Sequence, residues 1–376
     1  MNSSEIMEKF LEFENSSNVL DYRYQYRNML IWPFVRSVVW NAVMECNAGE
    51  GSGVVDSTAQ NIGKVKVFSY KWLQFFKLKK NPLFCRENKD IIFMYSSIGS
   101  IRDDAGRYYN RVHDDFVALY DNTAIIESAP MFKHFYPKKY HAYESDSLDI
   151  ICLLNEKLAR LSKNDEAEIN AFIAYLRAEL PYKINEKHWQ TVRVELERYA
   201  KNNKLIYWYY KKCFEHMSPK LVFVAQGCDG NHTACKIKVL KDMGIPCAEI
   251  QHGFVGLAHR AYNYSNKIFQ SEEYQTYMPD VFLTMGKYWI DCIRIPINKV
   301  VLGNANFCAN KQKIKGDHQP QGILILPTPD IQPWRDLVTC SGGCSGCPHP
   351  CRYRRTGSPA AQSGRTAAAR PRPAGP

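Results

Sequence analysis

The sequence lacks several features that would place it in a membrane, outside the cell or on nucleic acid. It has no apolar run of the ~18–20 residues that a membrane-crossing helix needs. Its first eight residues, Met-Asn-Ser-Ser-Glu-Ile-Met-Glu, lack the basic and then apolar pattern of a secretory signal. No DNA- or RNA-binding signature is visible. These absences predict a cytoplasmic protein, or one that rests against the inner membrane from inside.

Acidic residues are missing from one end of the chain, and this absence explains most of its positive charge. Residues 337–376 contain no Asp or Glu, and the last 36 residues carry six of the arginines. Without those six, the formal net charge of +11 falls to 11 − 6 = +5. We therefore expect no nucleic-acid partner. The stretch Lys77-Leu-Lys-Lys80 is either a solvated helix end or a stripe that attracts anionic lipid headgroups.

Paired cysteines are also missing from most of the chain. Nine of the 13 cysteines are scattered without ligand spacing, as in a reduced protein, and four cluster at Cys340, Cys344, Cys347 and Cys351. Composition changes near residue 336, from Lys, Asn, Ile, Tyr and Phe to Gly, Pro, Ala, Arg, Ser and Cys. The cysteines form either a small zinc or iron–sulfur site, or part of a chance translation after a frame shift. We favour chance translation, which predicts a disordered, aberrant tail over 337–376 and no metal site.

Apolar segments alternate with helical patterns, and this rhythm predicts the fold class. We expect an α/β protein with a parallel, helix-covered sheet. The predicted strands are residues 90–95, 122–126, 221–225, 246–250, 279–284 and 299–302. The predicted helices are residues 22–45, 146–163, 165–179, 187–215, 233–243 and 287–294, the first with Pro33 near a turn or kink.

The length of 376 residues predicts two or three domains. We expect an N-terminal helical segment over 1–60, which ends in a small-residue linker at 49–63. A Rossmann-like domain follows over 61–310, with a helical insertion at about 146–215. Residues 311–336 then begin a second Rossmann domain with a strand at 322–326, and the aberrant tail replaces the rest.

The most informative motif follows a short apolar strand over residues 245–250. This strand runs straight into Gln251-His252-Gly253, and His259 and Tyr262 come soon after. Ligands of open α/β sheets bind at the carboxyl ends of the strands, and histidine is the side chain best suited to exchange protons near neutral pH. A buried histidine that only satisfies loop carbonyls is the alternative. The clustering favours a catalytic histidine.

Together these elements resemble bacterial surface-polysaccharide glycosyltransferases of the GT-B fold, which carry two facing Rossmann domains. The resemblance rests on a Gln-Gly-x-Asp loop, the Glu-Ile-Gln-His-Gly element, His-x2-Tyr, Gly-x-Tyr-Trp and Val-x-Gly-Asn, and on a Trp-Pro-x2-Arg helix start at Trp32. It implies transfer of a sugar from a nucleotide-activated donor onto a capsule, O-antigen or lipopolysaccharide glycan. The His-Gly turn is also similar to that of CDP-glycerol glycerophosphotransferases, so polyol-phosphate transfer is a second hypothesis. A third is a non-catalytic remnant that binds glycan or partner proteins.

The resemblance also implies roles for particular residues. His252 is expected to act as the catalytic base or to contact the sugar phosphate, and Asp229 to act as base or nucleophile unless it only caps the next helix. Expected contacts of the substrate are Gln251, Gly253, His259 and Tyr262, with Arg102, Asp103 and Asp104 holding acceptor hydroxyls unless their loop is merely solvated. No cofactor is expected, because the nucleotide-sugar is the donor substrate. The acceptor is expected to be a glycan or a lipid-linked glycan.

One departure from the family pattern concerns the second domain. In the GT-B architecture that domain binds the nucleotide-sugar, using a helix N-terminus and basic residues for the phosphates. Here it barely begins at Gly322 before the tail replaces it. We therefore expect the chain to be poorly soluble or rapidly degraded, and inactive as it stands despite an intact His252.

Overall fold

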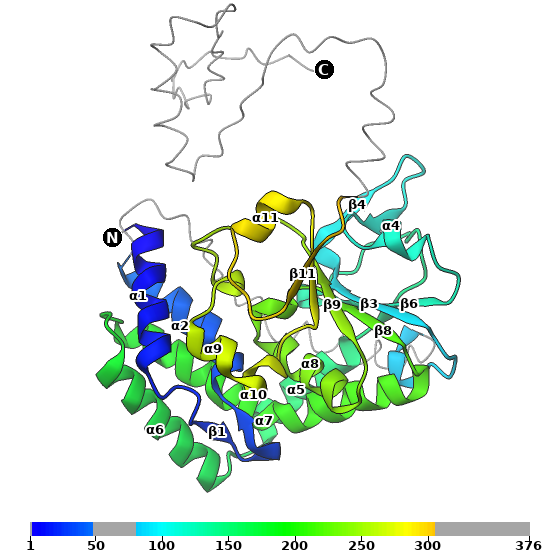
Figure 1. Cartoon of the computed structure of the whole chain (residues 1–376). Coiled ribbons are helices and arrows are strands. Elements are labelled where there is room, and N and C mark those ends of the chain that lie inside the picture. The colour runs from blue at the N-terminus through cyan, green and yellow to red at the C-terminus, as the bar shows by residue number, and fades with distance from the viewer. Residues whose placement is uncertain (1, 48–79, 305–376) are drawn as a thin grey trace, which may run out of the picture. The chain divides into compact units, whose positions relative to one another are not determined.

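The computed structural model describes residues 2–47 and 80–304 (Figure 1). These residues belong to one compact unit, Met1–Gln321. The predicted linker, the strand at 322–326, the tail and its four cysteines lie outside the described residues. Of the basic stretch 77–80, only Lys80 lies within them.

Seven of the described strands form a single sheet in which every neighbouring pair runs parallel. All six predicted strands are confirmed, and the seventh, β7, was not predicted. The helices flank this sheet, so the predicted α/β class is confirmed and the topology is compatible with a Rossmann-like fold. The strands are β3 (Ile91–Ser96), β6 (Thr123–Ser128), β7 (Tyr143–Glu144), β8 (Leu221–Val224), β9 (Cys247–Ile250), β10 (Val281–Thr284) and β11 (Asn298–Val301).

The strand order shows where a ligand would bind. Across the sheet it is β11-β10-β9-β8-β3-β6-β7. The chain builds outward from β3 through β6 to β7, then crosses to the other side of β3 and builds outward again from β8 to β11. The direction thus reverses between β3 and β8. In open α/β sheets, ligands bind outside the carboxyl ends of the strands at such a reversal.

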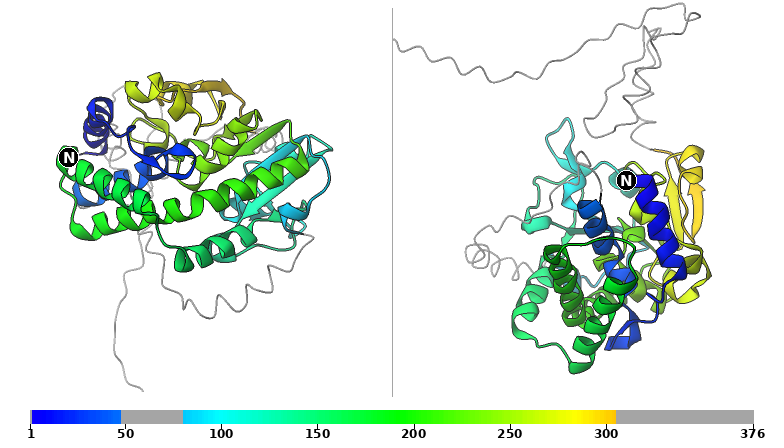
Figure 2. Two further views of the ribbon diagram at one scale, coloured as in Figure 1. Left: turned by 90° about the horizontal axis from the view of Figure 1, so that it is seen from below. Right: turned by 90° about the vertical axis from the view of Figure 1, so that its left-hand side faces the viewer.

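Ten helices flank the strands in the described part of the chain. The long helix α7 contacts α2, α5, α6 and α8 and runs through the middle of the helical layer (Figure 2). At its start the backbone N–H of His188 donates to the Asn185 side chain, and at the start of α6 the N–H of Asp165 donates to the Ser162 hydroxyl. The helices are α1 (Ser3–Ser16), α2 (Trp32–Asn47), α4 (Asp114–Val117), α5 (Asp146–Leu158), α6 (Lys163–Glu179), α7 (Glu186–Met217), α8 (His232–Asp242), α9 (Asn266–Gln270), α10 (Glu272–Gln275) and α11 (Lys287–Asp291).

The predicted helix over 22–45 is wrong in its first third. Strands β1 (Arg23–Tyr24) and β2 (Met29–Leu30) pair antiparallel there, around Arg27 and Asn28 with positive φ angles of 55° and 52°. Helix α2 begins only at Trp32, so Pro33 occupies its first turn, where the missing N–H costs nothing, and does not kink it. The sequence analysis also missed α1, although its start carries a capping box between Asn2 and Glu5.

Burial on both faces explains why the central strand β3 is a continuous apolar run. In β3, Ile92 and Met94 point into the large core shared with the helices, whereas Phe93 and Tyr95 pack in a smaller cluster on the other face. The large core also contains residues of α1 and α2, such as Phe10. The predicted helical segment 1–60, as far as it is described, therefore packs as part of the sheet domain.

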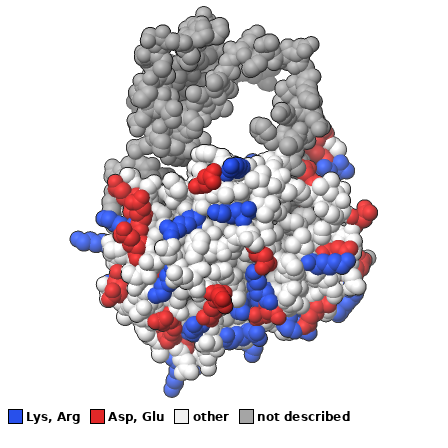
Figure 3. All heavy atoms as spheres, viewed as in Figure 1, with Lys and Arg blue, Asp and Glu red and all other residues white. Residues whose placement is uncertain are grey.

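A hairpin not predicted as strands lies between β3 and β6. Strands β4 (Ser100–Arg102) and β5 (Tyr108–Asn110) pair antiparallel where a polar loop was expected (Figure 1). On the face seen in Figure 3, positive and negative side chains are interspersed. None of the helices in the described ranges is long and apolar enough to cross a membrane.

Candidate active site

A fully buried glutamate anchors the candidate site at the carboxyl end of β9. Glu249 has no exposed surface, and its Oε1 accepts a hydrogen bond from the Tyr262 hydroxyl at 2.7 Å. Its Oε2 accepts from the backbone N–H of Cys228, also at 2.7 Å, which ties β9 to the loop after β8. Burial raises the pKa of Glu249, while His252 and these hydrogen bonds oppose the rise. The sequence analysis did not single out Glu249, although a carboxylate inside an apolar strand was a visible signal.

His252 lies beside this carboxylate. Its Nδ1 is 3.7 Å from Oε1 of Glu249, and the imidazole side chain is 35% exposed. Nδ1 itself is buried and has no hydrogen-bond partner. Because catalytic hydrogen bonds are often long in ligand-free proteins, a small ring movement would complete the Glu249–His252 pair. One edge of the ring thus faces a buried carboxylate while the ring stays accessible.

Asp229 forms an ion pair across the same strand ends. Its Oδ1 is 3.1 Å from Nε of Arg260, and its Oδ2 accepts from a terminal nitrogen of Arg260 at 3.2 Å. Burial raises the pKa of Asp229, and the Arg260 guanidinium opposes this shift. The alternative that Asp229 caps the following helix is wrong, since Asn231 occupies the cap position of α8. Asp229 is therefore a largely buried carboxylate, with its side chain 17% exposed, that is paired with Arg260.

His259 and Tyr262 lie together in the next turn, with ring centroids 4.8 Å apart. Burial, then Arg260 and His252, lower the pKa of His259 to about 4, so this ring is neutral at physiological pH. Tyr262 is 1% exposed, and its hydroxyl donates a hydrogen bond to Glu249. In this conformation His259 and Tyr262 shape the site around His252.

Gln251 and Gly253 flank His252 and differ from each other. Gln251 is fully buried: its side-chain amide donates to the carbonyl of Gly253 at 2.9 Å and accepts from the N–H of Met285 at 2.8 Å. It therefore joins the loops after β9 and β10. Gly253 is exposed, and a Cβ built there would meet no atom within 4 Å. The fold itself thus does not require glycine at this position.

Arg102 and Asp103 make their contacts within their own hairpin. The Arg102 guanidinium lies 4.7 Å from the ring centroid of Tyr108. The Asp103 carboxylate accepts from the backbone N–H of Arg107 at 2.8 Å and from its Nε at 3.1 Å. The first of these bonds is the main cause that lowers the pKa of Asp103. Asp104 is exposed.

The base of this hairpin contributes a histidine that the sequence analysis missed. His113 is 2% exposed, and its Nδ1 bonds to the side-chain oxygen of Asn110 at 3.1 Å. Since that oxygen also accepts from two backbone N–H groups, Nδ1 carries the hydrogen and Nε2 is a bare acceptor without a partner. Burial lowers the pKa of His113 to about 3, and nearby His252 adds to the shift. No sequence motif marks His113, because its neighbours come from distant segments.

A second group of titratable side chains lies where β6 and β7 end. Glu127, Glu144 and Asp146 surround His134, and one ligand atom from each of His134, Glu144 and Asp146 falls within 4.8 Å of the others. Burial alone would lower the pKa of His134, but hydrogen bonds to Asp146 and Glu127 raise it to about 9. These residues were not predicted as a site, since segments that are separate in sequence supply them.

Two hollows lie near these groups and differ in position. One of about 10 Å³, the volume of a single water, lies between Tyr95, Asp114, Glu127 and Lys138. A wider one of about 520 Å³ lies at the amino end of β6, lined by residues such as Lys89, Thr123 and His141. That wider hollow is at the opposite strand ends from His252, so the titratable groups, and not its size, define the candidate site.

Comparison with known proteins adds no family to this picture. No model of a protein family matches the chain, and no curated protein matches it. The fold is thus that of an α/β protein with a Rossmann-like parallel sheet. The titratable side chains that could support a function meet at the carboxyl ends of β8 and β9.

Proposed function

We propose that this protein is a glycosyltransferase that moves a sugar from a nucleotide-activated donor onto a capsule, O-antigen or lipopolysaccharide glycan. The observation that carries the proposal is the pairing of accessible His252 with buried Glu249 at a strand end, one strand away from the reversal between β3 and β8. A histidine backed by a carboxylate is suited to act as a general base. The described residues would form the acceptor-binding half of a GT-B enzyme.

The proposed reaction begins at an acceptor hydroxyl. The free ring nitrogen of His252 takes the hydroxyl proton while the oxygen bonds to the anomeric carbon of the donor. The bond from that carbon to the phosphate oxygen breaks, and the nucleoside diphosphate leaves. Glu249 holds the ring and stabilises its positive charge once the proton has moved. In this proposal donor recognition belongs to the second domain, of which the sequence carries only the start at 311–336, outside the described residues.

Because this chain is expected to be inactive as it stands, turnover is tested in a full-length homologue with an intact second domain, using a panel of nucleotide-sugars and lipid-linked glycan acceptors. Replacing His252 by Ala should reduce turnover by ~100-fold or more, the usual contribution of a general base. Glu249→Gln should reduce it by roughly 10-fold or more, because the ring loses its orienting charge. His188→Gln is the matched control, since His188 lies on α7 and pairs with Glu45.

Three outcomes would contradict the proposal, each in a different way. Unchanged turnover in His252→Ala would remove the general base. Turnover of CDP-glycerol in place of nucleotide-sugars would favour the polyol-phosphate transferase. A folded chain that gives no heat with any nucleotide-sugar in calorimetry would favour a non-catalytic glycan-binding protein.

A further inference from the structure

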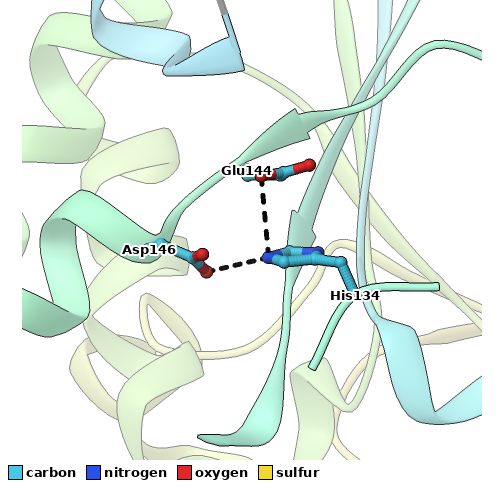
Figure 4. Close-up of side chains that lie close together, drawn as sticks. All are labelled: His134, Glu144 and Asp146. Atoms are coloured by element: carbon cyan, nitrogen blue, oxygen red, sulfur yellow. Dashed lines mark hydrogen bonds and ion pairs between the residues drawn. The ribbon is translucent and has the colours of Figure 1, made fainter. Parts of the chain in front are cut away.

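The His134 cluster, made of Glu127, His134, Glu144 and Asp146, lies at the carboxyl ends of β6 and β7. The proposed reaction uses the ends of β8 and β9, on the other side of β3. Glu127 is near the end of β6, Glu144 ends β7, Asp146 opens α5, and His134 comes from the loop between β6 and β7 (Figure 4). The side chains of His134, Glu144 and Asp146 are only 5–6% exposed. Burying so many charged groups is costly unless they are paired or hold an ion.

Three potential ligand atoms of this cluster lie within 4.8 Å of one another. Nε2 of His134 is 2.9 Å from Oδ1 of Asp146 and 3.9 Å from Oε2 of Glu144. Ligands bound tetrahedrally to one ion at about 2.0–2.2 Å lie roughly 3.3–3.6 Å apart. Small side-chain movements would therefore bring all three atoms onto a single ion.

The surroundings of these atoms have the pattern of a metal site's outer shell. The other ring nitrogen of His134, Nδ1, bonds to Oε1 of Glu127 at 2.5 Å, which orients Nε2 toward Glu144 and Asp146. Metal-binding histidines usually bond to a carboxylate in this way. Lys138 pairs with Glu127, and Lys80 donates to Oε1 of Glu144 at 3.0 Å. The Tyr136 hydroxyl also donates to Oε1 of Glu144, so these bonds leave Oε2, 3.9 Å from Nε2 of His134, for a ligand.

A buried oxygen without a partner gives a second, independent observation. Oδ2 of Asp146 makes no hydrogen bond, although Asp146 is 4% exposed. Leaving a buried carboxylate oxygen without a partner is unfavourable, so this oxygen calls for a bound group. The charges agree, because three carboxylates (Glu127, Glu144 and Asp146) face only two lysines. One further positive charge is needed, supplied either by a proton on His134 or by a metal ion.

We propose that His134 Nε2, Glu144 Oε2 and the Asp146 carboxylate bind a divalent metal ion of the zinc type. One imidazole nitrogen with two carboxylates suits zinc and its first-row neighbours, whereas Mg²⁺ and Ca²⁺ prefer oxygen ligands alone. Three protein ligands leave a fourth position for water or a substrate oxygen. The site is independent of the proposed glycosyl transfer.

The test is a zinc titration of the full chain after treatment with a chelator, followed by calorimetry. Glu144→Gln and Asp146→Asn keep the shape of each side chain and remove its charge. Each should lower the zinc stoichiometry by one equivalent relative to the parent chain, or weaken that equivalent by about 100-fold. Glu127→Gln should weaken it by about 10–100-fold, as expected for a partner of a metal-bound histidine. His188→Gln should change nothing.

A second metal, Co²⁺, distinguishes this site from metal bound by thiols elsewhere in the chain. Co²⁺ bound by nitrogen and oxygen gives weak visible bands without a thiolate charge-transfer band, and the Asp146→Asn chain should lose those weak bands alone. Thermal melting in the absence of metal checks that each variant folds. The proposal is overturned if folded Glu144→Gln and Asp146→Asn bind as much zinc as the parent. It is overturned equally if the parent binds no zinc after its cysteines are alkylated, which would leave only an ion-pair network.

Discussion

Breaking the buried Arg36–Glu14 pair should destabilise this protein more than almost any other single charge change. Arg36 is 3% exposed and donates from Nε to Oε1 of Glu14 at 2.6 Å. Its terminal nitrogens donate to the backbone carbonyls of Arg260 and Asn263. Burial alone would lower the pKa of Arg36, but Glu14 and other neighbours raise it overall. One cation thus joins α1 and α2 to the loop that carries Arg260 of the candidate site.

The expected magnitude follows from burial. Arg36→Met keeps the length of the side chain but leaves Glu14 charged, with no exposed surface. Removing one partner of such a pair costs about 3–5 kcal/mol. Glu14→Gln should be similarly costly, because it leaves Arg36 unpaired. The double variant should be more stable than the sum predicts, with a coupling of about 0.5–3 kcal/mol, because neither charge is then left alone.

The chain contains its own control for this experiment. Arg23 and Glu273 make two short contacts, at 2.5 and 2.8 Å, but their side chains are 28% and 46% exposed. Arg23→Met should therefore cost no more than about 1 kcal/mol. Urea unfolding followed by circular dichroism measures all the variants. The reasoning is refuted if Arg36→Met costs as little as Arg23→Met, because burial would then not set the strength of these pairs.

Four further changes test the candidate site and its surroundings. Gly230→Ala should destabilise the fold by more than 1 kcal/mol in urea unfolding, since its φ is +76° and a Cβ would lie 2.2 Å from the carbonyl oxygen of Pro33. Gly253→Ala should leave stability unchanged, so any loss of turnover there would come from ligand contact; a large loss of stability would contradict the open space seen at Gly253. Tyr262→Phe should cost about 1.5–3 kcal/mol by removing the hydrogen bond to buried Glu249. A cost below about 0.5 kcal/mol, which is typical of a neutral surface change, would argue against that bond. The pKa of His113 is lowered to about 3, so the unfolded chain takes up a proton below about pH 6.5 that the folded chain excludes. Stability is thus lost as the pH falls, by about 2 kcal/mol at pH 5, and His113→Gln should lose less than the parent between pH 7 and pH 5.

The sequence was sufficient for elements whose signals are local. The strands at β3, β6, β8, β9, β10 and β11 are apolar runs ended by polar turns, and the structure confirms each within a few residues. β3, β6 and β9 could be predicted because burial on both faces favours apolar side chains along the whole strand. The edge strand β11 is largely exposed, and its apolar run alone predicted it. The long helices α5, α6 and α7 were likewise predicted with nearly correct bounds. By contrast, Arg27 and Asn28 adopt positive φ, which no apolar pattern reveals, so the predicted helix over 22–45 was wrong at its start.

The tertiary structure alone decided which charged groups meet. His252 stood out in the sequence because it follows a strand, but its partner Glu249 looked like part of that strand until burial showed its role. His113 reaches the same region from a hairpin base, and Arg36 meets the carbonyl of Arg260 from a position 224 residues away. Parallel strands bring their carboxyl ends together from distant segments, so such contacts have no local sequence pattern. The sequence determined where each strand ends, and the strand order determined which side chains become neighbours there.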